Sequence, residues 1–248
     1  MRNPPDGYWG PATSSVDWCE ANYRFSPYVA ELFNTLSSLA IVGVGILGLV
    51  RYRKKLETRF SLAFLAIATV GLGSALFHAT LRFEHQMLDE LPMLYLTLVM
   101  VFILLELRPE RSHGRWLPLA LAAHGILVTL LCSLTRGRLQ FFVFHASFGS
   151  AEAFALYRVY LLYRASNRPR VRRLFRLGMS SYLGAVGLWF IDLRYCHFLS
   201  VTLPSFGIPN PELHAVWHVL VSFGFYLLVV LVAEERLEAL RAAPAAPS

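Results

Sequence analysis

The sequence has few cysteines and few charged residues, and each shortage excludes a class of protein. Cys19, Cys132 and Cys196 are the three cysteines, too few for a disulfide scaffold, and none forms a CxxC motif. Only 16% of the residues are charged, whereas a typical soluble domain has about 25%. No secretory signal precedes the first apolar run, so we expect the first span to act as the insertion signal.

What the sequence has instead is long apolar runs. Its residues are 56% hydrophobic and its mean hydropathy is +0.48. Seven runs reach the length of about 20 residues that a bilayer requires: 31–50, 60–81, 87–107, 116–134, 139–163, 174–193 and 213–233. The sequence therefore predicts an all-α bundle of seven transmembrane helices joined by short loops. We assign residues 1–30 to an N-terminal segment, 31–233 to the bundle and 234–248 to a tail.

The positive charges lie mostly between the apolar runs. The formal net charge is +7, but this grouping indicates residues that flank a membrane and argues against binding to nucleic acid. Sixteen of the 23 basic residues follow the first, third, fifth and seventh runs, and six lie on the opposite side. This bias predicts a lumenal or extracellular N-terminus and a cytosolic C-terminus.

Three histidines lie at the ends of two apolar runs that are far apart in the sequence. His78 lies near the end of the second run, and His214 and His218 lie at the start of the seventh. Residues four apart share one helical face, so His214 and His218 point the same way. Three histidines are a ligand set of catalytic zinc, which keeps an open position for water. Because polar groups at membrane depth are costly, we interpret this set as functional.

Ser74 and Asp89 complete this group of candidate site residues. Ser74 lies four residues before His78 and shares its helical face, while Asp89 begins the third run after a short loop. The predicted orientation places the whole group in the non-cytosolic leaflet. Helix capping or packing would explain one histidine in a span, but three with an acid and a hydroxyl at one depth favour a site.

An acidic segment before the first run carries hard oxygen donors at Asp17, Glu20, Asn22 and Glu31. Calcium accepts such ligands together with backbone carbonyls, although the loop pattern of an EF-hand is absent. From spacing alone, an ordinary acidic cap of the first helix is favoured over a calcium site.

Other reactive side chains receive structural interpretations. Cys19 and Cys196 both fall on the predicted oxidising side, which permits a disulfide, and the third cysteine is expected to be a buried apolar residue. In the fifth run, Glu152 and Arg158 are interpreted as structural, because an arginine within a span usually pairs with an acid or faces an interface. Asp192, at the end of the sixth run, either closes that end or supports the histidines.

Six motifs occur in an order that resembles the alkaline ceramidases, most of all the alkaline ceramidase 3 branch. They are GYWGP at 7–11, DWCEANY at 17–23, AELFNT at 30–35, GSALFHATL at 73–81, LDELPM at 88–93 and HAVWH at 214–218. The resemblance covers residues 7–233, and it implies a seven-helix membrane hydrolase that cleaves the linear amide of ceramide into a sphingoid base and a free fatty acid. In a eukaryotic cell it implies the endoplasmic reticulum or Golgi membrane.

The resemblance also implies the roles of individual residues. Zinc would be held by His78, His214 and His218, Asp89 would transfer protons, and Ser74 would help to hold the developing oxyanion. Calcium would be held by Asp17, Glu20, Asn22, Glu31 and the backbone carbonyl of Trp18, which reverses the preference for a helix cap. Family members also pair cysteines that match Cys19 and Cys196.

Two other classes of membrane protein compete with a hydrolase. Receptors of the adiponectin and progestin type also place three histidines and an aspartate in a seven-helix bundle, but their orientation is generally opposite and they lack the acidic N-terminal motif. A transporter is disfavoured because inverted repeats and paired broken helices are absent. Ceramide and the bilayer are the expected partners, with no obligate protein partner.

Overall fold

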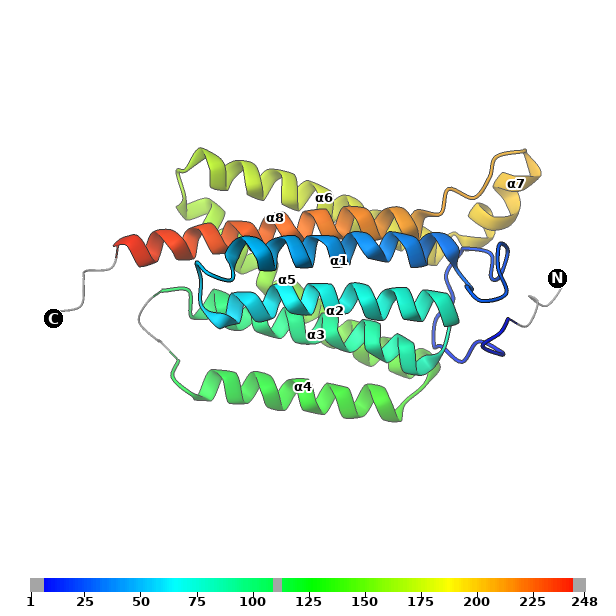
Figure 1. Ribbon diagram of the computed structural model, residues 1–248, viewed down its shortest axis with the longest axis horizontal. Helices are drawn as coiled ribbons and strands as arrows, with labels where there is room; N and C mark the ends of the chain where they lie inside the picture. The colour runs from blue at the N-terminus through cyan, green and yellow to red at the C-terminus, as the bar shows by residue number, and fades with distance from the viewer. Residues whose placement is uncertain (1–6, 109–112, 243–248) are drawn as a thin grey trace.

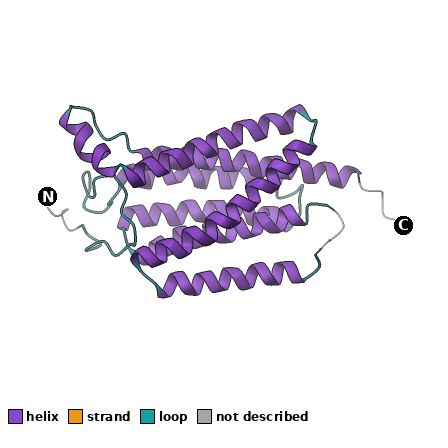
Figure 2. Ribbon diagram, turned by 180° about the vertical axis from the view of Figure 1, so that it is seen from behind, coloured by secondary structure: helices purple, strands orange, loops and turns teal. Residues whose placement is uncertain are grey.

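Each apolar run forms one long helix, because a run of about 20 apolar residues can satisfy its backbone internally and face lipid or a helical neighbour. The computed structural model describes residues 7–108 and 113–242. The long helices are α1 Leu32–Tyr52, α2 Thr58–Thr80, α3 Phe83–Leu105, α4 Trp116–Leu134, α5 Gly137–Ala165, α6 Pro169–Arg194 and α8 Leu213–Ala242. Within the described residues no strand is present, and loops gather at the two ends of the bundle (Figures 1 and 2).

Six of these helices are long and apolar enough to cross a membrane, which makes the chain a multi-pass membrane protein. They are α1, α2, α3, α4, α6 and α8, whose most apolar segments have mean hydropathies of 1.3 to 2.3. The fifth run forms the 29-residue helix α5, which contains charged residues such as Glu152 and Arg158 and is not among the six. The all-helical prediction is confirmed, whereas the count of seven spans and the orientation of the termini stay predictions.

The helices pack in pairs around a core that lies between α1, α2, α3 and α8. Helix α1 packs on α2 and α8, α2 packs on α3, and α6 packs on α8. Phe60, Phe64, Ile103 and Leu231 are fully buried where these helices meet. Helix α4 lies at the edge against α3 and α5, as Figure 1 shows, and most of its leucines are exposed. Exposed apolar faces of this kind suit a lipid environment.

The N-terminal segment is held against the end of α2 by backbone hydrogen bonds. The N–H groups of Thr13 and Ser14 donate to the Leu81 carbonyl, and those of Ala30 and Glu31 donate to carbonyls at the end of α2, at 2.9 to 3.1 Å. Figure 1 shows this segment beside the ends of α2 and α6 and the starts of α3 and α8. The predicted acidic segment and the predicted histidine site therefore lie at the same end of the bundle.

The sequence did not predict the structure of the connection between α6 and α8. A π-helix, Phe198–Thr202, and the one-turn helix α7, Leu203–Ser205, project there from the bundle. Helix α8 continues to Ala242, so the first part of the segment assigned to a tail, residues 234–242, is helical. Residues 243–248 lie outside the described part of the chain.

Candidate metal centre and active site

The three predicted histidines meet inside the bundle. His78 lies in the last turn of α2, and His214 and His218 lie in the first two turns of α8. All three are buried, with relative exposures of 1%, 3% and 0%, and their ligand nitrogens lie within 4.8 Å of one another. Buried imidazoles grouped in this way can hold a metal ion.

Hydrogen bonds to the outer nitrogens of two imidazoles leave their inner nitrogens available. The Nδ1 atom of His78 lies 2.5 Å from Oε2 of Glu31, and Nδ1 of His218 lies 2.7 Å from the hydroxyl of Ser37. Ser37 donates its own proton to the Asn34 carbonyl, so it accepts the N–H of His218. Outer partners of this type fix the tautomer of a ligating histidine and leave Nε2 free for a metal.

His214 is positioned by aromatic stacking rather than by a hydrogen bond to its ring. Its ring stacks on Trp18 at a centroid distance of 3.8 Å and on Trp217 at 4.8 Å. Its buried Nδ1 has no hydrogen-bond partner in the described part of the chain, as expected of an atom that awaits a ligand. Asp192 accepts the backbone N–H groups of His214 and Cys19, so it supports the histidines, one of its two predicted roles.

Ser74 and Asp89 come to the histidines from two adjacent helices. The Ser74 hydroxyl lies 3.3 Å from Nε2 of His218 and accepts a hydrogen bond from Ser38 at 3.0 Å. Helix α3 approaches α2 closely at Gly73, where an added Cβ would overlap the Leu88 carbonyl and lie 2.9 Å from the Asp89 nitrogen. The absence of a side chain at position 73 therefore brings Asp89 beside the site.

The histidine site opens on a cavity of about 520 Å³. Ser74, Asp89 and His214 line it, together with Trp18 from the N-terminal segment. Most of the remaining wall is apolar and comes from α2, α3, α5, α6 and α8. A cavity of this size with a few polar groups is typical of a small-molecule or lipid-chain site.

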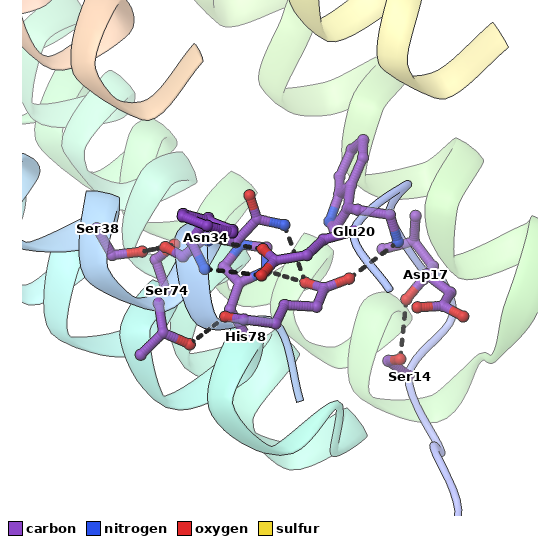
Figure 3. A network of polar contacts seen from close by, with 12 residues as sticks. Ser14, Asp17, Glu20, Asn34, Ser38, Ser74 and His78 are labelled. Atoms are coloured by element: carbon purple, nitrogen blue, oxygen red, sulfur yellow. Dashed lines mark hydrogen bonds and ion pairs between the residues drawn. The ribbon is translucent and has the colours of Figure 1, made fainter. Parts of the chain in front are cut away.

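The predicted calcium residues gather next to the histidines. The backbone N–H of Trp18 donates to Oε1 of Glu31 at 3.3 Å, and the amide of Asn22 donates to Asp17 at 3.1 Å. Figure 3 shows how polar contacts continue from Ser14 and Asp17 toward His78. Burial raises the pKa of the Asp17 carboxyl, and the buried Oδ1 of Asn22 has no described partner. Clustered carboxylates beside an unused amide oxygen suit a calcium ion.

Glu20 serves the helix-cap role that spacing alone had favoured. Its two carboxylate oxygens accept the backbone N–H groups of Phe33 and Asn34, at 2.7 and 2.9 Å. These are first-turn amides of α1, which lack partners within the helix. Burial, opposed by these hydrogen bonds, raises the pKa of Glu20, and the charge of Glu31 adds to the increase.

The sequence analysis missed one further acid at this end of the bundle, Glu212. Burial and the charge of Glu20 raise the pKa of Glu212 to about 7, and its Oε2 is buried without a described partner. Asn210 accepts the Glu212 N–H and donates to the Cys19 carbonyl, so the residues just before α8 are joined to the N-terminal segment. The only signal in the sequence for a role of Glu212 was its position just before the HAVWH motif.

Cys19 and Cys196 form a disulfide, with their Cα atoms 5.2 Å apart. The bond connects the N-terminal segment to the connection that follows α6. Cys132 is free and fully buried in α4, as predicted.

These features define a multi-pass membrane protein with a buried group of three histidines, beside a serine and an aspartate, at one end of its helices. A family model described as Ceramidase matches residues 10–245, and the chain belongs to this family. It is 34% identical to alkaline ceramidase 3 of Mus musculus, over 96% of this chain and 90% of the relative.

Similar proteins occur in other kingdoms. The chain is 32% identical to the alkaline ceramidase YPC1 of Saccharomyces cerevisiae, over 90% of this chain and 77% of the relative. It is 30% identical to an alkaline ceramidase of Arabidopsis thaliana, over 91% and 85% respectively. These matches do not favour the receptor alternative.

Proposed function

We propose that the protein is a zinc-dependent intramembrane amidase that hydrolyses ceramide to a sphingoid base and a free fatty acid. The observation that carries this proposal is the meeting of three buried imidazoles with Ser74 and Asp89 on one apolar cavity. Membership of the ceramidase family supports ceramide as the substrate. Its relatives include alkaline ceramidases from animals, plants and fungi.

The side chains divide the chemistry between them. When bound by His78, His214 and His218, zinc would supply a Lewis acid and lower the pKa of a water molecule. Asp89 accepts the proton of the attacking water at a carboxylate oxygen and returns it to the leaving nitrogen. The Ser74 hydroxyl donates a hydrogen bond to the amide oxygen as negative charge develops on it. The apolar wall of the cavity holds the alkyl chains and excludes bulk water.

The membrane arrangement and the second metal are part of the same proposal. We infer that α5 also crosses the membrane, which brings the number of spans to seven. We infer further that the N-terminus is lumenal and that, in a eukaryote, the membrane is that of the endoplasmic reticulum or Golgi. Calcium bound by Asp17, Glu20, Asn22, Glu31 and the Trp18 carbonyl would neutralise repelling carboxylates and stabilise the segment that packs on His214. The stacking of Trp18 on His214 supports this structural coupling.

A direct test is hydrolysis of N-octadecanoyl sphingosine by the purified protein in lipid nanodiscs. We expect release of octadecanoic acid that stops after zinc chelation and returns on addition of zinc, with about one zinc per chain. His218→Ala should lose both the metal and the activity. His124→Ala should keep both, because His124 is exposed on α4, where its ring contacts the Ser147 hydroxyl of α5. Full hydrolysis by metal-free protein would refute the proposal.

A further inference from the structure

A second polar group lies in the cavity, away from the histidines. It consists of Thr97 on α3, Glu152 on α5 and Tyr182 on α6, which all line the same cavity as Ser74 and Asp89. Their relative exposures are 0%, 5% and 8%. The Thr97 hydroxyl lies 3.0 Å from Oε2 of Glu152, and the Tyr182 hydroxyl hydrogen-bonds the same carboxyl group. We call these three residues the deep polar cluster.

Among the described residues, the deep polar cluster has no positively charged partner. In the described part of the chain no basic side chain forms an ion pair with Glu152, and Arg158 instead donates to the Leu104 carbonyl at 3.3 Å. The Thr97 hydroxyl oxygen lies 3.0 Å from both Oε2 of Glu152 and the Met93 carbonyl oxygen, and its one proton can be donated to only one of them. A neutral Glu152 satisfies this geometry, because its own O–H can donate to Thr97. A neutral carboxyl beside a phenol can both donate and accept hydrogen bonds.

The cluster marks a fixed depth in the cavity. Thr97 follows Asp89 by eight residues of α3, which corresponds to about 12 Å along a helix at 1.5 Å per residue. The wall around it is apolar, with Ile67, Val70 and Phe225 among its residues. An alkyl chain whose amide lies beside Asp89 therefore passes the cluster near the middle of its length.

From this placement we propose that the deep polar cluster is a specificity subsite for a hydroxyl group in the middle of the acyl chain. The inference rests on the proposed ceramidase function. A substrate hydroxyl could accept from Tyr182 and donate to the Glu152 carboxyl, whereas a plain methylene group gains no such bond. The protein would then favour ceramides with a mid-chain hydroxylated acyl group over those with an unsubstituted chain of equal length.

Three N-acyl sphingosines of equal chain length test this subsite: octadecanoyl, 12-hydroxyoctadecanoyl and, as a position control, 2-hydroxyoctadecanoyl. For the wild-type protein we expect kcat/KM to be about two- to tenfold higher for the mid-chain hydroxylated substrate than for the plain one, the factor that one net hydrogen bond provides. The 2-hydroxyl lies too close to the amide to reach the cluster, so it should give no such gain. A wild-type ratio of one or less between the mid-chain and plain substrates would overturn the inference.

Variants then assign the preference to the cluster. Tyr182→Phe and Glu152→Leu should reduce the ratio to about one, and Tyr157→Phe, an exposed tyrosine on α5, should leave it unchanged. If the cluster only held the helices together, its variants would lower kcat/KM for all substrates equally and the ratio would persist, which would also overturn the inference. Failure of the wild-type protein to hydrolyse any of the three substrates would instead refute the proposed function.

Discussion

Glu31 and His78 connect the predicted calcium segment to the predicted zinc site by a single hydrogen bond. Oε2 of Glu31 lies 2.5 Å from Nδ1 of His78, and both side chains are buried. Glu31 directly precedes α1 and His78 lies in the last turn of α2, so the bond also joins two helices. A residue predicted as a calcium ligand is thus placed to orient a zinc ligand.

Substitution of Glu31 should therefore affect zinc as well as calcium. In Glu31→Gln the amide lacks the negative charge that stabilises the His78 N–H, and partners of this type typically contribute about 10–100-fold to metal affinity. We expect zinc affinity, measured by competition with a chelator, to fall by a factor in this range. Glu84→Gln, at an exposed glutamate in the first turn of α3, is the matched control. Unchanged zinc affinity in Glu31→Gln would show that the bond does not orient the ligand.

Asp89 and Ser74 should be needed for the reaction and not for binding of the metal. Asp89→Asn removes the proton acceptor, and general acid–base groups contribute about 10²–10⁴-fold to rate. Ser74→Ala removes one donor to the developing oxyanion, and we expect a loss of about 10²-fold. Zinc content and kcat, measured on the same preparations, separate the two effects. Loss of zinc in Asp89→Asn would identify Asp89 as a structural residue.

Gly73 gives a test of how the fold positions Asp89. In Gly73→Ala the new methyl group would overlap the Leu88 carbonyl and push α3 away from α2. Alanine favours a helix over glycine by up to about 1 kcal/mol, so any loss must come from this contact. We expect kcat for ceramide to fall at least tenfold while zinc remains bound. Gly43→Ala on α1, where a Cβ meets nothing within 4 Å, should keep full activity.

The bundle was predictable from sequence because its long helices coincide with the apolar runs, and the start and end of each run can be read from the local sequence. The pair His214 and His218 was also visible, since a spacing of four residues is a local signal. The roles of Ser37 and Glu212 were not, because each depends on contacts between segments that are far apart in the chain. Glu152 was correctly placed in a helix, but its partners on α3 and α6 could not be inferred from its neighbours in sequence.

The orientation of the bundle is open to a direct measurement. The excess of basic residues after the odd-numbered runs predicts a lumenal N-terminus and a cytosolic C-terminus. In sealed microsomes that carry the protein with a tag at each end, protease should remove the C-terminal tag and spare the N-terminal tag. Detergent should then expose the N-terminal tag to the protease. The reverse pattern would move the histidine site to the cytosolic leaflet.

Calcium and the Cys19–Cys196 disulfide should both stabilise the N-terminal segment in its position against the bundle. The disulfide fastens the N-terminal segment to the connection after α6, and Asn210 from that connection donates to the Cys19 carbonyl. A disulfide typically contributes about 2–4 kcal/mol, and a ligand at 100 times its Kd contributes about 2.7 kcal/mol. Cys19→Ser should therefore lower Tm, weaken calcium binding and reduce activity while zinc remains stoichiometric.

The position of calcium is tested by Tm as a function of calcium concentration in the wild-type protein, Glu20→Gln and Glu84→Gln. In the absence of calcium, the carboxylates of Asp17, Glu20 and Glu31 repel one another, and the ion would remove this repulsion. We expect calcium to raise Tm strongly in the wild-type protein and in Glu84→Gln, and only weakly in Glu20→Gln. If calcium stabilises Glu20→Gln as much as the wild-type protein, Glu20 is not a calcium ligand and only caps α1. The hydrogen bonds that its carboxylate accepts from the N–H groups of Phe33 and Asn34 would then explain its position.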